Sequence, residues 1–199
     1  ALPIWFPPNS RLVLFKQLEN HAYNDVAETV GVNHVNPSGT IVADVNRDGR
    51  PDIISGQSSV RHAKIPTRLY LYENQSSRQG RRSLRFLLKG DKANVNGLGA
   101  TVTIQTEEWI SRRWHHPHYG PLPSQNEKGV FFFFFIENRP LKVEVLWPAL
   151  RSSKGEEGRA KPFPTTYALK GIFKNTQDDH LNIVLCENGN WYKGEGNCD

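Results

Sequence analysis

The chain has 199 residues, a formal net charge of +5 and 37% hydrophobic residues. A chain of this length and composition can bury a core, which argues against a disordered protein. No segment approaches the roughly 20 consecutive apolar residues of a membrane-spanning helix, so we expect no membrane span. The mild basic excess is compatible with a polyanionic partner such as an acidic glycan or a nucleic acid.

The composition predicts an all-β fold. Sixteen glycines and thirteen prolines stand among many β-branched and aromatic residues, and no long run has the helical period, which favours short strands joined by tight turns. Residues 10–16 and 67–73 share an alternating pattern, so they indicate either an internal repeat or a chance similarity.

In the first part of the chain, short β-branched runs at residues 40–43 and 53–54 flank a polar, glycine-containing loop. They predict a strand, a loop and a second strand that form a hairpin. A polar stretch at residues 74–82 is the best candidate for a linker. We therefore expect a division into residues 1–80 and residues 81–199.

In the second part, residues 84–88 and 100–104 predict another hairpin, and residues 109–128 a long excursion without strands. Strands return at residues 130–136 and 141–147. Five consecutive phenylalanines, residues 131–135, could not all point inward from a strand that packs on one side only. We therefore expect this strand to be central and buried on both faces.

The loop between the first two strands carries the clearest chemistry. Oxygen-bearing side chains occupy loop positions 1, 3, 5 and 9, with glycine at position 6. Ca²⁺ takes six to eight oxygen ligands, and glycine permits the sharp turn that such a shell needs. The pattern therefore predicts a calcium site with ligands from Asp44, Asn46, Asp48, the carbonyl of Arg50, and Asp52; the alternative is a polar turn without an ion.

The two cysteines, Cys186 and Cys198, lie close together near the end of the sequence. They predict a disulfide that closes a short loop, and with it a secreted or extracellular protein, or a periplasmic or cell-surface one in a bacterium. Free thiols in a reducing compartment are the alternative. Asn74 begins an N-glycosylation sequence pattern.

A basic and aromatic segment is the best candidate for a glycan or polyanion contact, because aromatic faces stack on sugars or bases while guanidinium groups pair with anions. A transition-metal site that serves a hydrolase, and a plain surface loop, are the alternatives. The candidate residues are Arg112, Arg113, Trp114, His115, His116, His118 and Tyr119.

Taken together, the loop, its flanking strands and residues 68–74 resemble an FG-GAP or VCBS-type repeat, the calcium-binding unit of integrin-like β-propellers. The resemblance implies a propeller-blade-like unit and the five calcium ligands named above.

The second half resembles the ASPIC/UnbV module that follows such repeats in cartilage acidic protein and in bacterial secreted proteins. Residues 88–102, 122–126, 131–135 and 143–148 carry that likeness. It implies a β-sandwich-like module, on which the blade-like unit packs.

The resemblance and the loop together suggest a calcium-stabilised extracellular module that binds a protein or a glycan, as in cell adhesion, without catalysis. A basic lectin-like or polyanion binder is the second interpretation, and a metal-assisted hydrolase the third.

Overall fold

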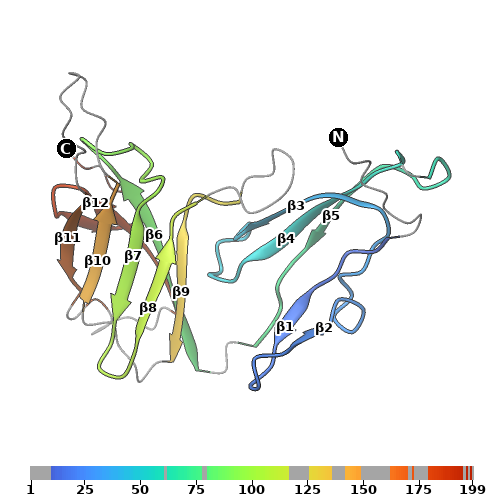
Figure 1. Cartoon of the computed structure of the whole chain (residues 1–199), viewed down its shortest axis with the longest axis horizontal. Coiled ribbons are helices and arrows are strands. Elements are labelled where there is room, and N and C mark those ends of the chain that lie inside the picture. The colour runs from blue at the N-terminus through green and yellow to red at the C-terminus, as the bar shows by residue number, and fades with distance from the viewer. Residues whose placement is uncertain are drawn as a thin grey trace. The chain divides into compact units, whose positions relative to one another are not determined.

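The computed structural model describes residues 10–60, 62–77, 80–116, 126–135, 142–148, 162–169, 172, 179–194, 196 and 198. Every regular element in this part of the chain is a β-strand (Figure 1), which confirms the all-β prediction. Within the same residues, no helix is long and apolar enough to cross a membrane. The strands fall into two compact units, β1 to β5 in the first and β6 to β13 in the second, which also includes residues 46–50.

The first unit holds two antiparallel sheets. Strands β1 (Phe15–Gln17) and β2 (Tyr23–Asp25) pair with each other, and β3 (Pro37–Ala43), β4 (Asp52–Gln57) and β5 (Arg68–Tyr72) form a sheet in that order. Strands β3 and β4 are antiparallel, and Ala43 lies opposite Asp52. The hairpin that the sequence predicts around residues 44–52 is therefore confirmed.

The two segments that suggested an internal repeat differ in structure. Residues 68–72 form β5, whereas in residues 10–16 the strand begins only at Phe15, and Arg11 makes an isolated bridge to Val35. The similar alternation therefore does not give the two segments the same conformation.

The second unit contains two four-stranded sheets, in the orders β11-β10-β7-β8 and β13-β12-β6-β9. The strands of this unit are β6 (Arg81–Lys89), β7 (Thr101–Gln105), β8 (Ile110–Trp114), β9 (Val130–Phe135), β10 (Lys142–Trp147), β11 (Phe163–Ala168), β12 (His180–Cys186) and β13 (Trp191–Lys193).

One apolar core joins these two sheets. Alternate side chains of β6, β7, β9, β10 and β12 point into it, because side chains along a strand project to opposite faces in turn. The fully buried large members include Trp147, Tyr167, Phe86, Phe132, Leu84, Ile104, Ile183 and Leu185.

The hairpin predicted for residues 84–88 and 100–104 is wrong. Both strands exist, but β6 pairs with β9 and β12, whereas β7 pairs with β8 and β10. The connection turns at Asn94, whose carbonyl accepts a hydrogen bond from the amide of Gly97 at 2.7 Å. Each strand has one apolar face, and placing them in separate sheets lets both faces share one core.

The prediction that the phenylalanine strand is central and buried on both faces is also wrong. Strand β9 is at one end of the sheet order. Phe132 and Phe134 enter the core, while Phe133 and Phe135 remain 45% and 47% exposed. The alternation of the strand therefore prevails over the uniform composition of the run.

Arginines of the neighbouring strand cover part of the outward phenylalanines. In the β6–β9 register Arg81 lies opposite Phe135 and Arg85 opposite Phe131. The Arg81 guanidinium carbon lies 5.1 Å from the Phe135 ring centroid, and that of Arg85 lies 5.9 Å from the Phe131 ring centroid. Arginine stems and cation–π contacts cover this face in place of the second protein layer that burial on both faces would require.

Two further boundaries differ from the sequence prediction. Residues 109–128 include the strand β8, which pairs along its length with β7. The predicted linker at residues 74–82 overlaps β6, which begins at Arg81. In both places exposed arginines hide the alternation of polar and apolar residues that marks a strand. They are Arg112 and Arg113 in β8 and Arg81 at the start of β6.

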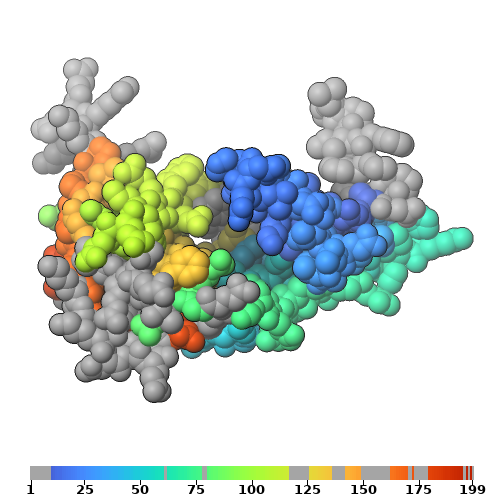
Figure 2. Space-filling model, turned by 90° about the horizontal axis from the view of Figure 1, so that it is seen from below, coloured from blue at the N-terminus to red at the C-terminus, as the bar shows by residue number. Residues whose placement is uncertain are grey.

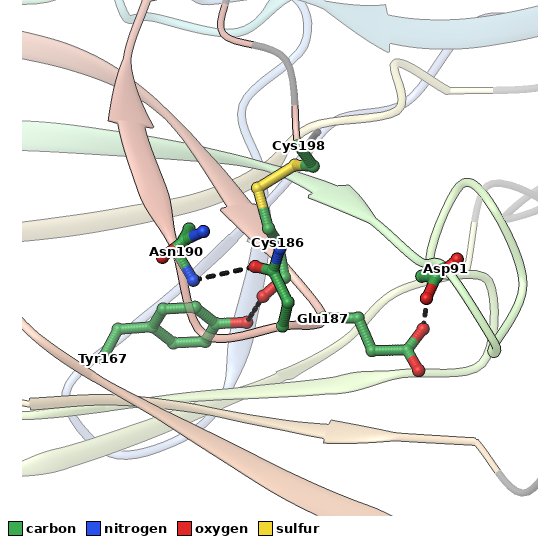
Figure 3. Close-up of a disulfide and its surroundings, with 7 residues drawn as sticks. Asp91, Tyr167, Cys186, Glu187, Asn190 and Cys198 are labelled. Atoms are coloured by element: carbon green, nitrogen blue, oxygen red, sulfur yellow. Dashed lines mark hydrogen bonds between the residues drawn. A yellow bond between two sulfur atoms is a disulfide. The ribbon is translucent and has the colours of Figure 1, made fainter.

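The predicted disulfide between Cys186 and Cys198 is present, with 5.7 Å between the Cα atoms. Figure 3 shows its surroundings: the Tyr167 hydroxyl donates to the carbonyl of Cys186 at 2.5 Å, and the Glu187 carboxylate accepts from the amide of Asp91 at 2.7 Å. Burial of Tyr167 raises the pKa of its hydroxyl, which keeps it protonated and able to donate. The bridge thus ties the end of β12 to the last described residues.

The alternation along β9 predicts opposite costs for neighbouring phenylalanines. Phe132→Ala should lower the free energy of unfolding by about 3–5 kcal/mol, because it leaves a cavity in the core, whereas Phe133→Ala should cost less than about 1 kcal/mol at its half-exposed position. Urea unfolding of both variants measures the difference. Equal losses would contradict the assignment of Phe133 to the outer face.

Candidate functional site

The loop between β3 and β4 has the turn geometry that its sequence pattern indicates. Arg47 and Gly49 have positive φ angles of 61° and 81°, in the left-handed region that glycine adopts without strain. Within the second unit, a Cβ added to Gly49 would come within 2.4 Å of Ser83 Oγ and of the His180 ring. Glycine at this position is therefore required both by backbone conformation and by close approach.

Asp48 is held inside the loop by short-range hydrogen bonds. Its Oδ1 accepts from the amide of Arg50 at 2.8 Å, its amide donates to Asn46 Oδ1 at 3.1 Å, and its carboxylate pairs with the Arg50 guanidinium. Burial alone would raise the pKa of Asp48, but the donors to its carboxylate outweigh that effect and lower the pKa below its ordinary value; they are the Arg50 amide, the Asn46 side-chain amide and the Arg50 guanidinium. Asp48 is therefore an ionised oxygen donor at neutral pH.

Asp52 has a structural role that the sequence pattern does not reveal. It is 1% exposed, and its two carboxylate oxygens accept from the amides of Val45 at 2.9 Å and Asn74 at 2.8 Å. The side-chain amide of Asn74 also donates to the carbonyl of Pro51 at 3.1 Å. Asp52 thus fastens the start of the loop and the residues after β5 to the first residue of β4.

The donor chemistry of the loop fits Ca²⁺, because Asp44, Asp48 and Asp52 supply carboxylates and Asn46 an amide oxygen. In the part of the chain that the structure describes, however, no three His, Cys, Asp or Glu side chains converge as a metal-binding group. The side chains of the loop instead form hydrogen bonds and an ion pair with one another and with backbone amides of the loop. A calcium ion would have to draw Asp48 away from Arg50.

The basic and aromatic segment forms β8 and the two residues after it. Trp114 is 59% exposed, its indole nitrogen donates to the carbonyl of Gly99 at 3.2 Å, and its ring lies 5.0 Å from that of His116. Arg112 and Arg113 are exposed on opposite faces of the strand. Arg112, Trp114 and His116 are therefore the part of the predicted surface that gathers on one side.

His115 is separated from that surface. It is 4% exposed, and its Nε2 lies 2.9 Å from the carbonyl of Asn96. Burial lowers the pKa of His115, so the ring is neutral at pH 7 and Nε2–H can donate to that carbonyl. His115 therefore anchors the turn before β7. His118 and Tyr119, which the sequence also suggests, lie outside the described residues.

The sequence analysis missed two buried polar clusters. In the first unit, His34 stacks on Tyr70 at 4.4 Å, and its Nδ1 lies 2.8 Å from the Tyr72 hydroxyl. In the second, Ser83 Oγ lies 2.7 Å from His180 Nδ1. Ser83 is buried, which withholds its hydroxyl from solvent and favours a structural role. The alternate tyrosines of β5 were the one sequence signal for the first cluster.

The sequence matches none of the protein-family models and none of the characterised proteins with which it was compared.

The burial of His115 predicts a pH dependence of stability. Because its folded-state pKa lies below the unfolded value, His115 contributes stability at neutral pH that is lost as the pH falls through about 6.5 toward the folded-state pKa. Urea unfolding at pH 7.5 and pH 5.5 should show that the free energy of unfolding falls less between these pH values in His115→Gln than in the wild type. His21→Gln, an exposed position, is the matched control and should leave the loss unchanged.

Proposed function

We propose that the chain is a calcium-stabilised extracellular binding module, without catalysis, whose ligand is a protein or a glycan. The observation that carries the proposal is the left-handed backbone at Arg47 and Gly49 in the β3–β4 loop, whose sequence carries the oxygen-bearing residues Asp44, Asn46, Asp48 and Asp52. In this proposal the first unit is a propeller-blade-like FG-GAP/VCBS repeat. The second is a sandwich-like ASPIC/UnbV module.

Calcium would act on the loop by replacing its internal contacts. Three carboxylates close in sequence repel one another, and the Arg50 guanidinium relieves part of that repulsion by pairing with Asp48. A divalent ion relieves more of it and is held at the same time by the amide oxygen of Asn46 and the carbonyl of Arg50. The loop would thereby become rigid at the end of the hairpin.

The disulfide between Cys186 and Cys198 supports the extracellular part of the proposal. Disulfides persist in oxidising compartments and are rare in the cytosol. A calcium-binding loop also suits that environment, because extracellular modules bind calcium at millimolar concentrations.

Calcium should raise the melting temperature of the purified protein. At a hundredfold excess over the dissociation constant the folded state should gain about 2.7 kcal/mol, because only the folded state holds the complete site. Asp48→Asn keeps the size of the side chain and removes its charge, so it should abolish most of the gain. Differential scanning calorimetry with calcium, and with a chelator, measures both effects.

Glu107→Gln is the matched control, since it removes one exposed carboxylate far along the sequence from the loop. It should leave the calcium response intact. Identical melting curves of the wild type with calcium and with chelator would reject the site. If Asp48→Asn and Glu107→Gln lose the calcium-induced rise in melting temperature equally, the effect is one of general charge instead.

A polyanion, such as an acidic glycan or a nucleic acid, is the second candidate ligand. The exposed Arg112 and Trp114 on the same face of β8 favour it, because guanidinium groups pair with anionic groups and the indole face stacks on sugars or bases.

A double variant of Arg112 and Arg113 to Gln should therefore elute from a heparin column at lower salt than the wild type. The double variant of Lys64 and Arg68 to Gln has the same net charge and should elute at higher salt than the Arg112/Arg113 variant. If both variants elute together, net charge alone governs the binding and the polyanion surface is rejected.

A further inference from the structure

A pocket of about 400 Å³ in the second unit lies outside every site considered so far. Its volume falls within the roughly 300–1,000 Å³ of typical small-molecule sites. Among the described residues it is lined by Arg81, Trp109, Phe133, Phe134 and Phe135. The lining therefore combines one arginine with four aromatic residues.

Paired strands and a tight turn hold the pocket in place. Arg81, the first residue of β6, lies opposite Phe135, the last residue of β9. Trp109 precedes β8, where its amide donates to Thr106 Oγ1 at 3.1 Å and its carbonyl accepts from the amide of Thr106 at 3.0 Å. Figure 2 shows atoms of β9, in gold, at the surface beside yellow-green atoms of the β7–β8 hairpin. Hydrogen bonds therefore position the backbone at Arg81, Phe135 and Trp109.

The charge of Arg81 is not neutralised by a carboxylate in the described part of the chain. Its guanidinium instead lies over the Phe135 ring, at 5.1 Å from the centroid. By contrast, Arg85, two side chains further along the same face of β6, pairs with Glu127. A guanidinium that rests on an aromatic face keeps its N–H donors available for an anion in the plane of the group.

The remaining lining is apolar and partly open to solvent. Phe133 and Phe135 are each nearly half exposed, Phe134 is buried, and Trp109 packs against the core. Among the described lining residues, the hydrogen-bonding side-chain groups are the Arg81 guanidinium and the Trp109 indole N–H, and both are donors only. A sugar, whose hydroxyls need acceptors as well as donors, suits this lining less well than a flat apolar ring.

We infer that this pocket binds a small ligand that carries an aromatic ring and a carboxylate. The ring stacks against the faces of Phe133, Phe135 or Trp109, and the carboxylate takes a bidentate pair of hydrogen bonds from Arg81. The inference is independent of the calcium loop, because none of the loop residues lines the pocket.

Titration calorimetry with 2-naphthoate tests the pocket directly. The wild type should bind this probe. It should bind 2-naphthalenemethanol, which has the same ring without the charge, at least about tenfold more weakly than 2-naphthoate. Cyclohexanecarboxylate, which keeps the charge without the aromatic ring, should also bind more weakly. Both comparisons are made with calcium and with chelator, so that a failure of the calcium loop remains distinguishable from a failure of the pocket.

Variants identify the residues that hold the probe. Arg81→Gln should weaken 2-naphthoate binding by about tenfold or more and Arg81→Lys by less, because lysine keeps the charge but loses the bidentate geometry. Phe135→Ala should weaken binding of both naphthalene probes. Arg68→Gln removes an exposed arginine of the first unit and should leave binding unchanged. The melting temperature of each variant checks that it is folded.

Two results would overturn the inference. One is the absence of 2-naphthoate binding to the wild type at about 1 mM, a concentration at which even a weak specific site is occupied. The other is binding that Arg81→Gln and Phe135→Ala leave unchanged in folded protein, which would place the probe elsewhere. Stronger binding of a uronic acid oligosaccharide than of 2-naphthoate would likewise reject the aromatic ligand.

Discussion

Strand β6 organises the second unit, because both of its edges pair with strands that are distant in the sequence. Strand β9 lies antiparallel on one edge and β12 parallel on the other, where Ser83 faces His180 and Lys89 faces Cys186. A parallel neighbour requires a long crossover rather than a tight turn. The strands of the other sheet, β7, β8, β10 and β11, all precede β12 in the chain. The pairing of β12 with β6 therefore joins segments that are remote in sequence.

The same pairing explains how β9 tolerates its composition at the sheet edge. Exposed aromatic edge strands tend to associate with other chains, and charged side chains are one means of protection. Arg81 and Arg85 provide such charges on the adjacent strand, each over the ring directly opposite. Glu127 then pairs with Arg85, whereas within the described residues Arg81 contacts the Phe135 ring and no carboxylate. This difference between the two arginines is the basis of the proposed ligand pocket.

Local patterns in the sequence were sufficient for the elements whose neighbours are close in the chain. The hairpin of β3 and β4, strands β6, β7 and β10, and the disulfide follow from alternation, turn residues and spacing. Pairing between distant strands was not predictable, so β6 and β7 were wrongly joined and β9 was placed at the centre. In the candidate site, the oxygen donors were readable, but the amides of Val45 and Asn74 that hold Asp52 were not.

Two acidic residues of the loop, Asp48 and Asp52, differ in the partners that hold their carboxylates. Asp52 is buried and bonded to two amides, so it fixes the hairpin with or without an ion. Each carboxylate oxygen has two lone pairs, and Asp52 can therefore ligate a cation without giving up those amides. Asp48 is different, because its partner is the charged side chain of Arg50, which a divalent ion at the proposed position would displace. If the loop binds calcium as proposed, the energetic cost would thus be concentrated in the Asp48–Arg50 pair.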